Sequence, residues 1–263
     1  MSVETKKIGL VLSGGGYRAA AHAGAIKALE EHAIYPDMVS GTSAGALVGA
    51  LYAAGYSPQE IVAVLKKIKL FSFSRYALGK PGFVDTDTFK EFLLEYLPDN
   101  DFQTLQKRLY ITATDLVNGT AKIFTKGDLI SAILASSAFP GVFTPVIIDN
   151  TLYSDGGIVD NFPVDPLKNK CDELYGVYVS PVKKMNMEEF RHSYNVVDRA
   201  LHLKMHRNSV AKFPICNLVI YPDKLGDYGL FSPNHLDEIF EIGYSATKME
   251  LEKWYAEMAF LKH

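Results

Sequence analysis

Two short apolar runs near the start of the chain, each followed by a tight turn and an alanine-rich stretch, constrain the fold most strongly. The runs are Ile8–Leu12 and Met38–Gly41, and the stretches that follow are Arg18–Glu31 and Ser43–Ala54. Short buried runs of this kind predict strands, and the alanine-rich stretches predict helices. Strand, helix, strand and helix in this order predict a parallel sheet with right-handed crossovers. Both strand ends then lie at one edge of the sheet, where open α/β sheets bind ligands.

The rest of the chain continues to alternate strands with helices, without an internal repeat, a low-complexity linker or a break in composition. Ser57 and Glu60 have the spacing of a capping box at a helix start, and Asp149-Asn150 is a hairpin turn between two short strands. We therefore expect one α/β domain over residues 1–263, with a mostly helical part over 182–263. Further strands are expected at 109–113, 122–124, 146–148, 151–153, 174–179 and 218–221, and further helices at 57–69, 85–96, 128–135, 194–212 and 234–261.

Composition excludes several classes of protein. The 263 residues are 48% hydrophobic and 22% charged, with a formal net charge of −3, so nothing favours a nucleic-acid partner. Cys171 and Cys216 are far apart and lack metal-ligand spacing, which indicates reduced core thiols. The start has no signal-peptide pattern and no segment is apolar enough to span a membrane, so we expect a cytoplasmic protein, with peripheral contact at a membrane surface still open.

The stretch Gly41-Thr42-Ser43-Ala44-Gly45 matches the G-x-S-x-G pattern of a nucleophile elbow. Its predicted context, a strand before the serine and a helix after it, is what that geometry requires. Small flanking residues allow the strained backbone of such a turn to approach its neighbours. The alternative is a tight turn in which Ser43 only caps the following helix.

The turn Ser13-Gly14-Gly15-Gly16 has two interpretations. Backbone N–H groups without side chains, at the start of a helix, can stabilise the oxyanion of acyl transfer. The spacing from Gly14 to Ala19 also fits the G-x-G-x-x-G/A fingerprint of a dinucleotide site. That fingerprint expects an acidic residue at the end of the second strand, where Ser40-Gly41 lies instead. The dinucleotide interpretation is weakened but stays open.

A serine nucleophile needs a base, and no histidine lies at a glycine-marked loop. The seven histidines are His22, His32, His192, His202, His206, His235 and His263. Asp155, by contrast, ends a predicted strand and precedes Gly156-Gly157, which permit a sharp turn. An aspartate beside glycine is also a common turn residue, so this position alone does not establish a base.

The glycine loop, the serine elbow and the Asp-Gly-Gly strand end, in this order, resemble the patatin-like phospholipase family. The resemblance runs from about Ile8 to Pro166, well over half the chain. It also includes Ala113–Leu116, Ala135–Phe143 and Asp160–Val164. It implies a three-layer α/β/α sandwich around a central, mainly parallel sheet, and a lipid acyl hydrolase that uses a Ser–Asp dyad.

Carried over by position, the resemblance implies that Ser43 is the nucleophile and Asp155 the base. Gly14, Gly15 and Gly16 would form the oxyanion hole, and Arg18 would occupy the family's basic position as a candidate anion or phosphate contact. Ala19 departs from the pattern, since the family usually carries glycine there. Because a free aspartate has a pKa of about 3.9, the dyad requires a desolvated site. The scheme needs no metal and no cofactor, and we expect neither.

Residues 66–80 contain five basic residues, three aromatic residues and no acidic residue. Such a mixture suits an anionic lipid interface, so this segment is a candidate lid or membrane contact. The alternative is a helix end with packed aromatic side chains and solvated lysines.

We expect a lipid or lysolipid substrate. Three other functions stay open: a nucleotide-binding oxidoreductase using Gly14–Ala19, an α/β-hydrolase with a histidine base such as His235, and a catalytically silent scaffold.

Overall fold

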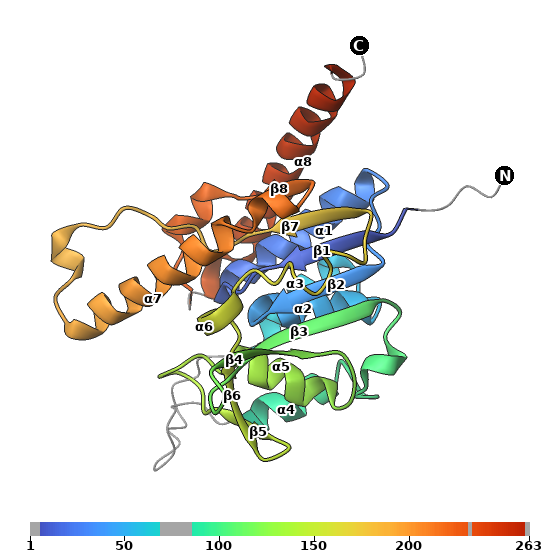
Figure 1. Cartoon of the computed structure of the whole chain (residues 1–263). Coiled ribbons are helices and arrows are strands. Elements are labelled where there is room, and N and C mark those ends of the chain that lie inside the picture. Colours follow the sequence, from blue (N-terminus) through green and yellow to red (C-terminus); the bar gives the residue numbers. More distant parts are fainter. Residues whose placement is uncertain (1–5, 69–85, 231–232, 261–263) are drawn as a thin grey trace.

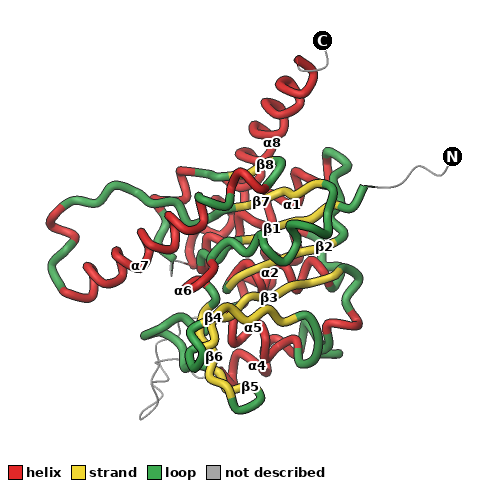
Figure 2. The backbone as a smooth tube through the Cα atoms, in the orientation of Figure 1, coloured by secondary structure: helices red, strands yellow, loops and turns green. Residues whose placement is uncertain are grey.

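The computed structural model describes residues 6–68, 86–230 and 233–260, and it contains a mixed eight-stranded sheet between helices (Figures 1 and 2). Along the sheet the strands lie in the order β5-β6-β3-β2-β1-β7-β8, and β4 pairs with β3 off this path. The strands are β1 (Ile8–Leu12), β2 (Met38–Thr42), β3 (Arg108–Asp115), β4 (Thr120–Phe124), β5 (Val146–Ile148), β6 (Thr151–Asp155), β7 (Glu173–Val177) and β8 (Leu218–Ile220).

The centre of the sheet is parallel, as predicted. β1 pairs with both β2 and β7 in parallel, and β2–β3 and β7–β8 are parallel too. β4, β5 and β6 form an antiparallel extension: β6 and β4 each pair antiparallel with β3, and β5 with β6. Since β1 and β2 are adjacent and parallel, the glycine turn after β1 and the serine turn after β2 lie at one edge of the sheet.

Helices cover both faces of the sheet, which confirms the predicted three-layer α/β/α arrangement. α1, α2, α3, α5 and α8 pack on one face, and the short α6 lies on the other; α7 contacts α6 and extends to the left of the sheet in Figure 1. The helices are α1 (Ala20–Glu31), α2 (Ala44–Ala53), α3 (Pro58–Lys67), α4 (Thr86–Leu94), α5 (Leu129–Ser137), α6 (Gly157–Asp160), α7 (Ser193–Val210) and α8 (Leu236–Phe260).

The alternation of side chains along β1 separates two hydrophobic clusters. Leu10 and Leu12 point into the larger cluster, which α1, α2, α3, α5 and α8 share, whereas Val11 points into a smaller one with Phe162 and Tyr178. The larger cluster extends along the chain from Leu10 to Leu251. This shared core supports the prediction of one domain over residues 1–263, which stays a prediction.

Local sequence signals locate most elements to within a few residues. The predicted capping box is present, since the amide of Ser57 donates to Glu60 Oε2 (2.8 Å) and Glu60 donates back to Ser57 Oγ (3.4 Å). Asp149 and Asn150 both have positive φ, 48° and 61°, as a tight hairpin turn requires. Most of the predicted membrane-contact segment 66–80 lies outside the described residues.

Two local features differ from the expectation. The helix predicted from Arg18 begins instead with a 3₁₀ turn over Gly16–Ala19, and α1 starts at Ala20. In this turn the amide of Tyr17 donates to the carbonyl of Leu230 (2.9 Å), far away in the sequence. The short helix α6 directly after Asp155 was not predicted, since Gly156 and Gly157 favour a turn at least as strongly as a helix.

Candidate active site

Ser43 occupies a strained turn between β2 and α2. Its φ of 54° and ψ of −127° are unusual for a residue with a side chain. Gly45 makes the turn sterically possible, because a Cβ there would lie 2.4 Å from the carbonyl oxygen of Ser13 and 2.5 Å from that of Leu12. The predicted strand–serine–helix context of the elbow is therefore present, and the strain holds Ser43 at the edge of the sheet.

The hydroxyl of Ser43 donates a hydrogen bond of 2.6 Å to Asp155 Oδ2. The sheet explains how residues so distant in sequence meet. Thr42, directly before the serine, is paired with Thr112 on β3, and the next β3 residue, Ala113, is paired with Asp155. The structure thus brings together the two residues that the sequence predicts as nucleophile and base.

The carboxyl group of Asp155 is buried, with 3% of the residue exposed. Burial raises its pKa from 3.8 to about 6, although the hydrogen bonds from Ser43 and from the amide of Gly157 oppose the rise. The Gly157 amide donates to Oδ1 at 2.7 Å, which leaves Oδ2 to face the serine. This is the desolvation that the dyad requires. A carboxylate with a pKa near 6 is ionised at neutral pH and still basic enough to accept a proton.

Ser136, at the end of α5, connects the elbow to the sheet. Its hydroxyl accepts a hydrogen bond from the amide of Ser43 (2.8 Å) and donates one to the carbonyl of Thr112 (2.6 Å). Thr114 in turn donates to the carbonyl of Asp155 (2.7 Å). The sequence placed Ser136 inside a stretch that resembles the family but assigned it no role; the structure identifies it as a positioning residue.

The glycine loop lies directly beside the elbow. A Cβ built on Gly14 would lie 3.2 Å from Ser43 Cβ, so any side chain there would crowd the serine. The amide of Gly14 already donates to the carbonyl of Asn161 (3.1 Å), and its carbonyl accepts from Ser180 Oγ (2.7 Å). Within the described residues, the amides of Gly15 and Gly16 donate to no protein acceptor. The three predicted glycines therefore line the pocket with different roles: Gly14 is anchored, and two amides are available.

No histidine within the described ranges is hydrogen-bonded to the Ser43 hydroxyl, which donates to Asp155. His22 is fully buried beneath the glycine loop, where its Nε2–H donates to the carbonyl of Ser13 (2.8 Å) and burial lowers its pKa to about 4. His235 lies on the surface and contacts Glu238 instead. His202 lines the pocket, but the group that accepts the Ser43 proton among the described residues is Asp155. A histidine-dependent α/β-hydrolase is not favoured.

Arg18 lies behind the pocket and is not among the residues that line it. Its side chain is buried, its Nε donates to the carbonyl of Tyr228 (2.8 Å), and burial lowers its pKa. The contact ties the 3₁₀ turn before α1 to the segment that carries Leu230, whose carbonyl accepts from Tyr17. The role of Arg18 as an anion contact stays a prediction.

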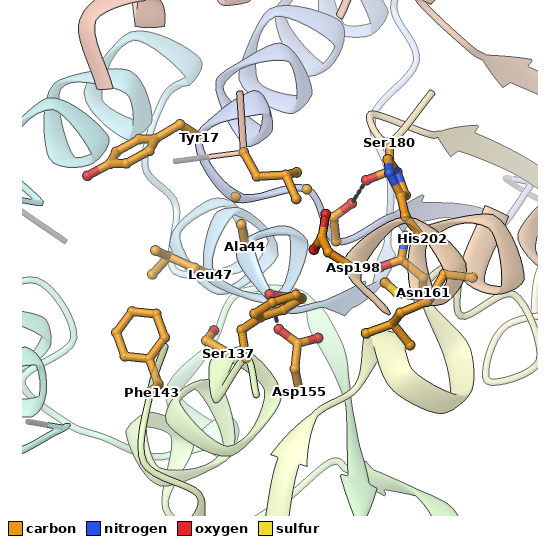
Figure 3. Close-up of a pocket in the computed structure, with 18 of the residues that line it drawn as sticks. Tyr17, Ala44, Leu47, Ser137, Phe143, Asp155, Asn161, Ser180, Asp198 and His202 are labelled. Atoms are coloured by element: carbon orange, nitrogen blue, oxygen red, sulfur yellow. Dashed lines mark hydrogen bonds between the residues drawn. The ribbon is translucent and has the colours of Figure 1, made fainter. Parts of the chain in front are cut away.

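The dyad lies in an open pocket at the edge of the sheet. Figure 3 shows Tyr17, Leu47 and Phe143 on one side of the dyad. On the opposite side lie polar groups contributed by the loops and by α7: Asn161, Ser180, Asp198 and His202. The sequence did not predict this C-terminal contribution, because helix α7 carries no motif.

Two other interpretations can now be weighed. The end of β2 carries Ser40-Gly41-Thr42 and no acidic residue, so the dinucleotide interpretation of the glycine loop is not favoured. No group of three or more histidine, cysteine, aspartate or glutamate side chains among the described residues could hold a metal ion. None of the described helices has the length and hydrophobicity needed to span a bilayer.

Known proteins resemble this chain in sequence and in fold. A family model of patatin-like phospholipases matches residues 10–168. Lysophospholipase nte1 of Aspergillus fumigatus is 26% identical over 282 residues, covering 96% of this chain but 18% of that protein. Lysophospholipase NTE1 of Scheffersomyces stipitis is 32% identical over 177 residues, covering 64% of this chain and 11% of that protein. The chain thus spans less than a fifth of these curated relatives.

The crystal structure of VipD from Legionella pneumophila shares the fold, with a TM-score of 0.56. Its sequence is 14% identical, and the match covers 95% of this chain and 67% of that one. At this identity the likeness concerns the fold alone, and it agrees with the α/β/α arrangement described above.

Proposed function

This chain belongs to the patatin-like phospholipase family, and we propose that it is a lipid acyl hydrolase that cleaves fatty acyl esters with a Ser43–Asp155 dyad. One observation carries the proposal: the hydroxyl of Ser43, on a strained turn, donates a 2.6 Å hydrogen bond to the buried carboxylate of Asp155. A serine on a tight turn that served only to cap a helix would not need a buried base. Ser43 in fact caps α2 with no side-chain hydrogen bond.

In the first half of the reaction, the Ser43 oxygen attacks the ester carbonyl carbon while Asp155 Oδ2 accepts the hydroxyl proton. The carbonyl π electrons move onto oxygen and form a tetrahedral oxyanion. We assign the amides of Gly15 and Gly16 as its donors, because they line the pocket and have no protein acceptor among the described residues. Gly14 contributes by having no side chain beside the serine.

Collapse of the oxyanion breaks the bond to the alcohol, which leaves with the proton that Asp155 held. The acyl group is now esterified to Ser43. Water then gives a proton to Asp155 and attacks the acyl carbon, and a second collapse returns that proton to Ser43 as the fatty acid leaves. The pKa of about 6 suits both roles of Asp155, acceptor and donor, near neutral pH.

The two sides of the pocket suggest how an amphiphilic ester would lie. The apolar side chains of Tyr17, Leu47 and Phe143 suit the acyl chain, and the polar side, with Asp198 and His202, suits the glycerol part. Because the relatives named above are called lysophospholipases, a lysolipid with a single acyl chain is the substrate class we propose. Peripheral contact of the enzyme with a membrane surface is part of the same proposal.

The test is hydrolysis of a chain-length series of acyl esters by wild type, Ser43→Ala and Asp155→Asn, combined with labelling by a fluorophosphonate probe. Ser131→Ala is the matched control, since Ser131 lies outside the pocket at the start of α5. We expect wild type and the control to turn over substrate and to be labelled. Ser43→Ala should lose both signals, and folded Asp155→Asn should lose turnover by at least about 100-fold.

Equal turnover by wild type and Ser43→Ala would remove the serine from the chemistry. Full turnover by Asp155→Asn together with a loss in His202→Ala would instead assign the base to the histidine of the pocket. A calorimetric signal for a dinucleotide, without labelling of Ser43, would favour the oxidoreductase.

A further inference from the structure

Helix α7 exposes apolar side chains on the face that points away from the protein. Val196, Val197 and Leu203 are 53%, 65% and 45% exposed, and the helix with its preceding loop projects from the body of the molecule (Figure 1). Single exposed apolar side chains are common on protein surfaces, but several that gather on one exposed face mark an interaction surface. Met187, 92% exposed in the preceding loop, extends the same apolar character.

The same region is basic in an acidic chain. Residues 183–210 contain six lysines and arginines and three acidic residues, a net charge of +3, whereas the whole chain has a formal net charge of −3. On the outward face, Lys204 and Arg207 are exposed next to the apolar residues. Among the described residues, neither of them forms an ion pair with an acidic side chain. The partner of this face should therefore carry negative charge.

The inward face of the same helix lines the catalytic pocket. Asp198, Leu201, His202 and Met205, at helical spacing, form part of the pocket wall. A surface in contact with the outward face would therefore lie one helix diameter, about 10 Å, from the pocket. A lipid that leaves that surface would have a short path to Ser43.

We propose that the outward face of α7, defined by Val196, Val197, Leu203, Lys204 and Arg207, docks the enzyme on an anionic lipid surface. This inference rests on the proposed lipid substrate, and it specifies which part of the chain contacts the lipid surface. Interfacial helices combine apolar residues that enter the headgroup region with basic residues that meet anionic lipid. A second copy of the chain fits less well, because a two-fold contact through this face would bring Lys204 and Arg207 towards their own copies.

Binding to vesicles tests the proposal. In the Ser43→Ala background, so that the lipid stays intact, the chain is partitioned onto vesicles of phosphatidylcholine with phosphatidylserine, and onto vesicles of phosphatidylcholine alone. The test pair is Lys204→Gln with Arg207→Gln. The matched control is Lys126→Gln with Lys168→Gln, two exposed lysines that lie away from the pocket.

We expect the test pair to bind anionic vesicles about 30-fold more weakly, since each basic residue near such a surface contributes about a fivefold factor. The control pair should bind as the parent does, and Val197→Asn with Leu203→Asn should weaken binding as well. With Ser43 restored, the test pair should hydrolyse a monodisperse ester normally and lose activity only on vesicles.

Three results would overturn the docking surface. They are unchanged binding of the test pair, an equal loss in the control pair, and a dimer in sedimentation velocity that Val197→Asn dissociates, which would make this face an interface between copies. Failure of the proposed function has a different signature, because turnover of the monodisperse ester would then persist in Ser43→Ala whatever the vesicles show.

Discussion

Replacing Asp155 by asparagine should stabilise the protein above pH 6 while it removes catalysis. The ionised carboxylate is buried, and its pKa is raised from 3.8 to about 6. Between these two values the native state holds a proton that the unfolded chain has released, so the wild type loses stability as the pH rises. The difference is just over two pH units, which at about 1.36 kcal/mol per unit corresponds to about 3 kcal/mol.

Asparagine removes this cost without losing the hydrogen bonds. Its oxygen can accept from the Gly157 amide, and its NH₂ can donate to Ser43 Oγ, because a hydroxyl accepts as well as donates. The unfolding free energy of Asp155→Asn minus that of wild type should therefore rise between pH 4 and pH 8. The expected rise is about 3 kcal/mol.

Urea denaturation of both proteins at pH 4, 6 and 8 measures this difference directly. The control is Asp165→Asn, an exposed aspartate whose replacement should show no comparable rise between pH 4 and pH 8. A difference between Asp155→Asn and wild type that does not change with pH would contradict the reasoning, since it would mean that the carboxyl is not held at a raised pKa.

Four further changes have defined outcomes. In the pH–rate profile, kcat/KM should fall about tenfold per unit below pH 6, where the carboxyl of the dyad becomes protonated; a limb near pH 4 would indicate an unburied base. Gly45→Ala should lower the free energy of unfolding by about 3 kcal/mol or more in a denaturation experiment, because its Cβ would lie 2.4 Å from a backbone oxygen. Normal stability would show that the elbow can shift. Ser136→Ala should lower the free energy of unfolding by about 1–3 kcal/mol, and it should lower kcat more than it raises KM, since it frees the amide of Ser43. Ser136→Thr should recover part of the lost stability and part of the lost kcat. Arg18→Met should raise KM while fluorophosphonate labelling persists, because it loosens residues 228–230; a loss of labelling would mean that Arg18 acts on the dyad itself.

The sequence predicts the order of the elements well because the signals for them are local. A strand ended by glycines, a capping box between residues three apart and an Asp-Asn hairpin turn each depend on a few neighbouring residues. The start of α1 is the instructive exception. The 3₁₀ turn at Gly16–Ala19 is hydrogen-bonded to the carbonyl of Leu230, a residue more than 200 positions away, and no local pattern predicts that contact.

The two residues of the proposed dyad were identified in the sequence for different reasons. Ser43 has a local motif with a defined mechanical requirement, the strained turn between a strand and a helix. Asp155 has only an aspartate–glycine pair, which is common in turns, and it was found through the resemblance of the whole motif set. Its burial and its bond to Ser43 follow from β3, which pairs with both β2 and β6. Strand order of this kind is a property of the sheet as a whole.

The residues that support the dyad were beyond local prediction. Ser136 meets Ser43 across 93 positions of sequence, and Ser180 meets Gly14 across 166. Serine is common on surfaces and in turns, so neither position stands out before the contact is known. The glycine loop shows the same limit at finer scale. Its three glycines look alike in sequence, yet among them only the Gly14 amide is hydrogen-bonded to another described residue.

We infer that catalysis and substrate selection depend on different parts of this chain. The elbow, the base and the glycine loop all lie within residues 10–168, which the family model matches, and their geometry is fixed by paired strands and a strained turn. On the polar side of the pocket, Ser180 and the α7 residues Asp198 and His202 lie beyond that match, whereas Asn161 lies within it. Side chains on a peripheral helix can change without altering strand pairing, whereas a change at Gly45 or Ser136 would disturb the backbone around Ser43. Differences in preferred lipid among relatives with the same dyad should therefore map to α7 and its preceding loop.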